Sequence, residues 1–159
     1  MRNILFTLFA VLLISAIGVG SANAQSALGY NADVTLLPSG SSTPAVASGA
    51  WITDTVLVAD QKNNDYRGLN LLFDITDTAG TASVTLTIQG KDAVSGKYYT
   101  ILAGAAKTAP GSTLMTVYPG CIAAANTVAN LPLPKVWRAW LNVPAGDSVK
   151  ATVGASLIK

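Results

Sequence analysis

The chain has 159 residues, of which 50% are hydrophobic and 11% charged, with ten Lys or Arg, eight Asp, no Glu and no His. The lack of histidine excludes Ser-His-Asp and Cys-His catalytic systems and removes the commonest transition-metal ligand. The small net charge argues against nucleic acid as the main partner, because such partners usually require a basic face. No cofactor is predicted.

Residues 1–24 have the layout of a secretory signal peptide. Arg2 gives a positive start, Ile4–Val19 is an apolar run, and an A-x-A cleavage pattern ends at Ala24. We expect cleavage between Ala24 and Gln25 and export to the periplasm or the medium. A membrane anchor is the alternative, although the run of 16 residues is short against the about 20 that a spanning helix needs. Membrane contact is expected only through an uncleaved leader.

The expected mature chain, residues 25–159, suits one domain of ordinary size. Residues 25–49 are rich in Ser, Gly, Ala and Pro and are predicted to form an N-terminal arm, with a short strand at Ala32–Leu37. The arm is either a mobile terminus or a segment that packs on a neighbouring subunit. Residues 50–159 form the predicted folded domain. Its single cysteine, Cys121, excludes an intramolecular disulfide.

Short segments with alternating apolar and polar residues, separated by turn residues, make up the domain. The predicted strands are Trp51–Val58, Arg67–Thr76, Ser83–Gln89, Lys97–Leu102, Thr113–Tyr118, Val136–Val143 and Ser148–Ile158. With Ala32–Leu37 they give about seven or eight strands and no helix in the mature chain. The fold class is therefore all-β, a single antiparallel β-sandwich or jelly-roll-like domain.

The most regular part of the pattern is Arg67–Leu102. We predict a three-stranded meander here, with turns at Asp77–Gly80 and Asp92–Gly96. One buried face should hold Leu71, Phe73, Val84, Leu86 and Ile88. Later in the chain, the long connection Cys121–Pro134 has room for one helical turn around Ile122–Ala125.

No catalytic residue is predicted, and the protein is expected not to be an enzyme. Cys121 lacks a base that would activate it, and Asp74 and Asp77 are more typical of turn formation than of an acid pair. A weak calcium candidate is the loop containing Asp60, Asn63, Asn64 and Asp65, whose oxygens suit a hard cation. Its spacing matches no strict calcium-loop pattern, and a solvated polar loop is the alternative.

Three aromatic residues are candidates for an interface or for stacking on a ligand. Tyr98 and Tyr99 are adjacent, so in a strand one of them faces outward, and Trp140 lies on the strand face opposite Trp137. An outward ring can stack on a sugar, lie in a subunit interface, or pack under a loop. The sequence leaves these three alternatives open.

The segment Ile88–Tyr99, with the sequence IQGKDAVSGKYY, resembles small β-sandwich proteins encoded in tailed-bacteriophage genomes. The likeness extends from Leu36 to Lys159 and includes Tyr118–Gly120, Leu133–Arg138 and Val153–Ile158. The resemblance implies a virion-associated structural protein, such as a capsid decoration or accessory protein, without catalytic residues. The predicted leader departs from that pattern, because virions assemble in the cytoplasm. Either a cell has recruited the protein for export, or the phage places it in the envelope or outside.

Three function hypotheses follow. The first is a structural protein that binds itself, as a homo-oligomer, or docks onto a larger assembly, with the virion surface as its location if the resemblance holds. The second is an exported module that binds polysaccharide or a cell surface. The third, an enzyme, has the least support.

Overall fold

The computed structural model describes residues 32–37, 51–81 and 83–159, and the part of the chain it describes is all-β and contains no helix. Within those ranges, no helix is long and apolar enough to cross a membrane. The strands are β1 Ala32–Leu37, β2 Val56–Leu57, β3 Gln61–Lys62, β4 Gly68–Ala79, β5 Thr85–Lys91, β6 Tyr98–Ala103, β7 Gly111–Val117, β8 Val128–Ala129, β9 Val136–Asn142 and β10 Ser148–Ile158.

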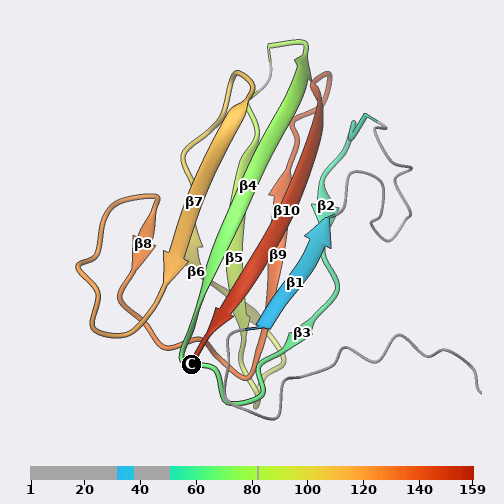
Figure 1. The fold of residues 1–159 in the computed structure, drawn as a ribbon. Helices are drawn as coiled ribbons and strands as arrows, with labels where there is room; N and C mark the ends of the chain where they lie inside the picture. The colour runs from blue at the N-terminus through green and yellow to red at the C-terminus, as the bar shows by residue number, and fades with distance from the viewer. Residues whose placement is uncertain (1–31, 38–50, 82) are drawn as a thin grey trace, which may run out of the picture.

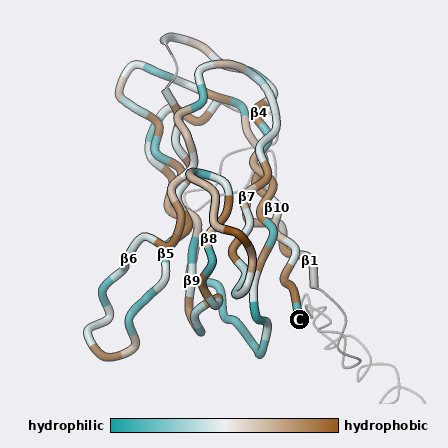
Figure 2. The backbone as a smooth tube through the Cα atoms, turned by 90° about the vertical axis from the view of Figure 1, so that its left-hand side faces the viewer, coloured by the Kyte–Doolittle hydropathy of each residue, from teal (hydrophilic) through white to brown (hydrophobic). Residues whose placement is uncertain are grey.

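The strands form two sheets in a sandwich-like arrangement (Figure 1). One sheet has the order β1-β10-β4-β7-β8, and we call it the β4 sheet. The other has the order β2-β9-β5-β6, with β3 also paired to β9, and we call it the β9 sheet. Figure 2, turned by 90°, separates the two layers, with β5, β6 and β9 on one side and β4, β10 and β1 on the other. The all-β prediction is confirmed, and so is the short strand at Ala32–Leu37.

The three-stranded meander predicted for Arg67–Leu102 is wrong. β4 pairs with β10 and β7, whereas β5 pairs with β9 and β6, so the chain changes sheets between β4 and β5. Of the predicted meander, only the β5–β6 hairpin is confirmed. β4 also runs to Ala79, into the predicted turn Asp77–Gly80, because Ser148 at the start of β10 pairs with Ala79. Alternation identifies which face of a strand is buried, but it does not identify the neighbouring strand.

The predicted core residues are buried, although they come from opposite sheets. Leu71 and Phe73 of β4 and Val84, Leu86 and Ile88 on or beside β5 are all at most 2% exposed. The two sheets therefore bury their inner faces against each other, as in layered β folds. The face of β9 and its end that carries Trp137, Ala139, Leu141 and Val143 is also buried.

The strand predicted at Trp51–Val58 is divided between the two sheets. Ile52 forms a bridge with Val149 of β10, with backbone N···O distances of 2.8 and 3.0 Å, whereas only Val56–Leu57 pairs with β9. Both Ile52 and Val56 are buried. The segment therefore crosses the edge of the sandwich and closes it, which a single alternating run of residues does not reveal.

The connection Cys121–Pro134 contains β8, and no helical turn forms at Ile122–Ala125, where the sequence has room for one. Val128 and Ala129 pair with Thr116 and Val117 of β7 in parallel register. Thr116 N donates to Thr127 O at 2.7 Å and Tyr118 N to Ala129 O at 3.0 Å. Pairing with the free edge of β7 satisfies backbone groups that a single helical turn would leave unpaired.

A buried carboxylate joins two of the turns. Asp147 is 7% exposed and follows Gly146, whose φ of 90° favours glycine. Its carboxylate accepts hydrogen bonds from Thr81 Oγ1 at 3.3 Å and Ser83 N at 3.1 Å. The β9–β10 turn therefore holds the connection that carries the chain from β4 to β5.

Candidate functional site

A polar cluster on the outer face of the β9 sheet is built around Tyr98. The Tyr98 hydroxyl donates to Asp60 Oδ1 at 2.6 Å, and Lys91 Nζ donates to Asp60 Oδ2 at 2.9 Å. The guanidinium carbon of Arg138 lies 3.3 Å from the centre of the Tyr98 ring, and Arg138 Nε donates to Gln89 Oε1 at 2.9 Å. Tyr98 and Lys91 are register partners of β6 and β5, so they project to the same side of the sheet.

The cluster stabilises its own charges. The hydrogen bond from Tyr98 and then that from Lys91 hold the pKa of Asp60 below its ordinary value. The bond to Asp60 raises the pKa of Lys91. Each group therefore keeps its charge near neutral pH, and the Arg138 guanidinium covers one face of the Tyr98 ring. Tyr98 lies on the outward side, but its ring is not a bare platform for a sugar.

Tyr99 points to the opposite side of β6 and lies over Gly90 of β5. A side-chain carbon on its register partner Gly90 would lie 2.5 Å from Tyr99 Cζ and 2.9 Å from Pro134 Cγ. Gly90 therefore makes room for the ring of Tyr99, and Tyr99 remains 47% exposed.

Trp140 is half-buried on the outer face of β9. Its register partner is Leu57 of β2, and Leu57 is 46% exposed. The three aromatic candidates thus do not share one surface.

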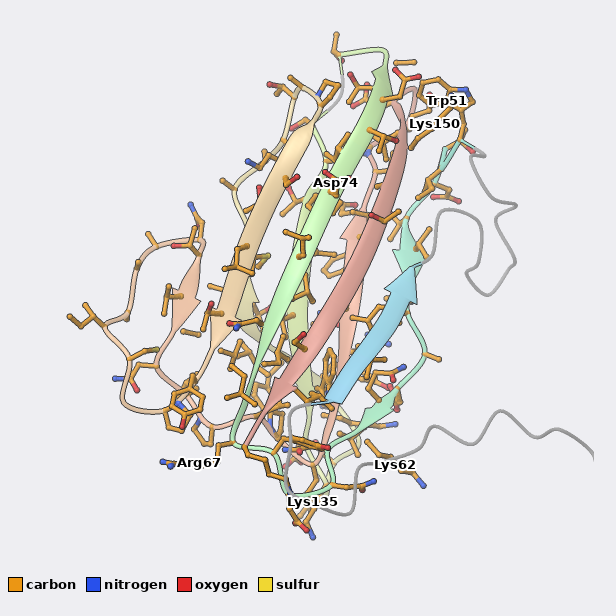
Figure 3. All side chains as sticks on the ribbon, viewed as in Figure 1. Trp51, Lys62, Arg67, Asp74, Lys135 and Lys150 are labelled. Carbon is orange, nitrogen blue, oxygen red and sulfur yellow. The ribbon has the colours of Figure 1, made fainter. Side chains whose placement is uncertain are left out.

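Other aromatic rings in the described part of the chain also carry a cation. Lys150 Nζ lies 4.6 Å from the ring centre of Trp51, and Figure 3 shows the two together at one end of the molecule. Lys159 Nζ lies 4.8 Å from the Tyr66 ring and Arg67 Cζ 5.5 Å from the Tyr118 ring. These contacts occupy ring faces that a sugar would need.

The loop considered for calcium does not turn its oxygens to a common point. Asp60 is engaged with Lys91 and Tyr98, and Asn63 Oδ1 accepts from Tyr66 N at 2.8 Å. Asn63 Nδ2 donates to the carbonyls of Tyr66 and Leu133, so Asn63 joins this loop to the chain before β9. A shallow hollow beside Asn64 and Asp65 is flanked by Lys62 and Lys135, whose charges oppose a cation. In the described ranges, no group of three or more His, Cys, Asp or Glu side chains could hold a metal ion.

The remaining reactive groups are engaged locally. Cys121 is a free, half-buried thiol whose Sγ lies 2.8 Å from the carbonyl oxygen of Tyr118. Asp92 accepts two bonds from Ser95, from its backbone N and from Oγ, each 2.6 Å long, and these lower its pKa. Asp74 accepts from Ser112 Oγ at 2.6 Å.

The outer face of the β4 sheet carries an exposed apolar pair that sequence reasoning missed. Leu72 of β4 and Leu114 of β7 are register partners and are 48% and 54% exposed. Gly154 of β10 is the partner of Leu72 on its other side, and these residues line a shallow hollow. The outward position of Leu72 follows from the alternation of β4, but no sequence signal places it beside Leu114.

Comparison with protein-family models, curated proteins and solved structures finds no match to this chain. The likeness to phage-encoded β-sandwich proteins therefore stays a hypothesis. The signal peptide, its cleavage at Ala24–Gln25 and most of the N-terminal arm lie outside the described residues.

Proposed function

We propose that this chain is a non-enzymatic structural protein that acts by self-association or by docking onto a larger protein assembly. The observation that carries the proposal is the pair Leu72 and Leu114, side by side and half-exposed on the outer face of the β4 sheet. Exposed apolar neighbours on a sheet face are typical of protein contacts. Their aliphatic character favours a protein partner over a sugar, which stacks on aromatic rings.

The proposal includes export by the predicted leader, and a role as a virion accessory or decoration protein if the phage resemblance holds. The jelly-roll-like topology predicted from the strand pattern stays a prediction. Neighbouring genes distinguish the two origins: capsid and tail genes favour a phage protein, and envelope genes favour a cellular one.

The second candidate function is binding of polysaccharide or a cell surface. It is favoured by Tyr99 and Trp51, whose side chains are 47% and 39% exposed. Against it stands the cation over the Trp51 ring and the position of Tyr99 against Gly90 and Pro134.

Light scattering and a glycan array, applied to the same purified protein, separate the two functions. We expect a mass that exceeds that of one chain and rises with protein concentration, and no glycan retained. A strict monomer at high concentration that binds a defined polysaccharide would replace the proposed function with the second candidate.

A further inference from the structure

We infer that the outer face of the β4 sheet binds a second copy of this chain, with the strands of the two copies running in opposite directions. This inference rests on the proposed function and names the surface and the partner. It concerns three rows of outward side chains, centred on Leu72 (Figure 3 labels Asp74 in the third row).

The middle row is apolar and open. It contains Leu114, Leu72 and Gly154 from three adjacent strands. A side-chain carbon at Gly154 would have no heavy atom within 4 Å, so nothing in the described part of the chain covers Leu72 on this side. Packing against a second copy would remove from water the two leucines that are about half-exposed in the single chain.

The flanking rows differ in hydrogen-bonding character. On one side, Asn70 Oδ1 accepts a hydrogen bond from Thr116 Oγ1 at 2.9 Å. This bond uses the amide oxygen of Asn70 and leaves its N–H groups as the donors of this row. On the other side, the carboxylate of Asp74 accepts from Ser112 at 2.6 Å through one oxygen and offers the second. A donor and an acceptor therefore lie two residues before and two residues after Leu72.

Because Asn70, Leu72 and Asp74 follow one another along β4, a two-fold axis at Leu72 can make this face complementary to itself. In a face-to-face dimer the axis lies in the plane of the interface, and the same patch meets itself. An axis that runs across the strands at Leu72 reverses their direction and places Asp74 of each copy over Asn70 of the other. It also places Leu72 on Leu72 and Leu114 on Leu114. An axis along the strands would bring the two Asp74 carboxylates together, and like charges across an interface are unfavourable.

The outer face of the β9 sheet lacks this property. Its exposed apolar residue, Leu57, lies at the edge strand β2 beside Trp140. The charged groups of that face already satisfy each other within one chain, through Asp60, Lys91 and Arg138. The β4 sheet therefore offers the better self-complementary face.

The first test exchanges the donor and the acceptor. Asn70→Asp places an acid over an acid, and we expect dimerisation to weaken about tenfold, equivalent to ~1.4 kcal/mol. Asp74→Asn should also weaken it, and the double variant Asn70→Asp/Asp74→Asn should restore it, because both substitutions are isosteric and only exchange the roles. Stronger dimerisation of Asp74→Asn alone would overturn the antiparallel arrangement.

The second test uses a short bis-maleimide cross-linker on the full chain with Cys121→Ser, which removes the native thiol. Leu114→Cys should cross-link rapidly to a dimer, whereas Val94→Cys, at a site that is 96% exposed, should react only at the rate of random collision. Equal rates in protein that light scattering shows to be oligomeric would overturn this surface and leave the proposed function standing. A wild-type chain that is strictly monomeric would overturn this inference and the self-association half of the proposed function, and would leave docking onto a larger assembly.

Discussion

Asp60 connects three segments of the chain through two side-chain bonds, to Tyr98 at 2.6 Å and to Lys91 at 2.9 Å. Arg138 adds β9 to the same cluster by lying over the Tyr98 ring. The residues concerned are partly exposed, so the cluster orients the short β3 edge more than it raises the stability of the domain. Its clearest signature is the depressed pKa of Asp60.

This pKa gives a pH prediction with a definite sign. A carboxyl whose pKa is lower in the folded than in the unfolded chain adds stability above the unfolded value, and that stability is lost as the pH falls through the folded value. Tyr98→Phe removes the largest cause, so the pKa of Asp60 should rise toward its ordinary value. Carboxyl NMR titration of the wild type and the variant measures this directly. An unchanged Asp60 pKa in Tyr98→Phe would contradict the geometry of the cluster.

Phe73 tests the register of β4. Its side chain is 2% exposed and faces the β9 sheet, so Phe73→Ala should lower the free energy of unfolding by ~3–5 kcal/mol. Val94→Ala, at the exposed tip of the β5–β6 hairpin, should stay within ~0.5 kcal/mol of the wild type. Denaturant unfolding at a fixed protein concentration measures both. An unchanged midpoint for Phe73→Ala would show that β4 is assigned the wrong face.

At the scale of elements, the sequence predicts which residues are buried better than it predicts which strands are neighbours. The alternation in β4, β5, β9 and β10 correctly indicates their inner faces. It could not show that β4 and β5 belong to different sheets, because pairing depends on partners such as β10, more than 60 positions further along the chain. The single strand predicted at Trp51–Val58 is wrong for the same reason, since its two halves pair with different sheets.

The candidate site was predictable only in part. The sequence identifies three aromatic candidates, Tyr98, Tyr99 and Trp140. It does not predict their surroundings, which depend on distant segments of the chain, such as Arg138 over Tyr98 and Pro134 beside Tyr99. The sequence does not predict the pair Leu72 and Leu114. The two leucines are 42 positions apart and become neighbours only when β4 pairs with β7.

The β5–β6 hairpin offers a test at this scale. Gly96 has a φ of 68°, with open space where a side chain would stand, so Gly96→Ala strains the backbone without a clash. We expect a loss of ~1 kcal/mol in unfolding free energy. Gly154→Ala is the control, because it also has open space but no positive φ; Gly154 lies in the proposed dimer surface, so both variants are compared at a protein concentration too low for association, where Gly154→Ala should be neutral or slightly stabilising. Thermal unfolding that ranks the two variants in the reverse order would contradict the hairpin geometry.

For the whole molecule, processing is the first expectation. Expressed with its leader in a bacterium, the protein should be found in the envelope or the medium with Gln25 as its first residue. Intact-mass measurement of the purified product decides the matter. A cytoplasmic, soluble product that keeps Met1 would contradict export.

Association through the β4 sheet is proposed from the exposed pair Leu72 and Leu114. A charge placed on this face should oppose burial, because an unpaired ion in an interface loses its hydration. The same change on the opposite face, at Leu57, provides the control, because Leu57 has similar exposure and lies in the other sheet.

The most direct measurement is light scattering during size-exclusion chromatography of the wild type, Leu114→Asp and Leu57→Asp at several concentrations. We predict a multiple of the chain mass for the wild type and for Leu57→Asp, and the mass of a single chain for Leu114→Asp. Circular dichroism confirms that each variant keeps its β structure. A wild type that stays a monomer, or a folded Leu114→Asp that keeps the wild-type mass, would contradict association through this face.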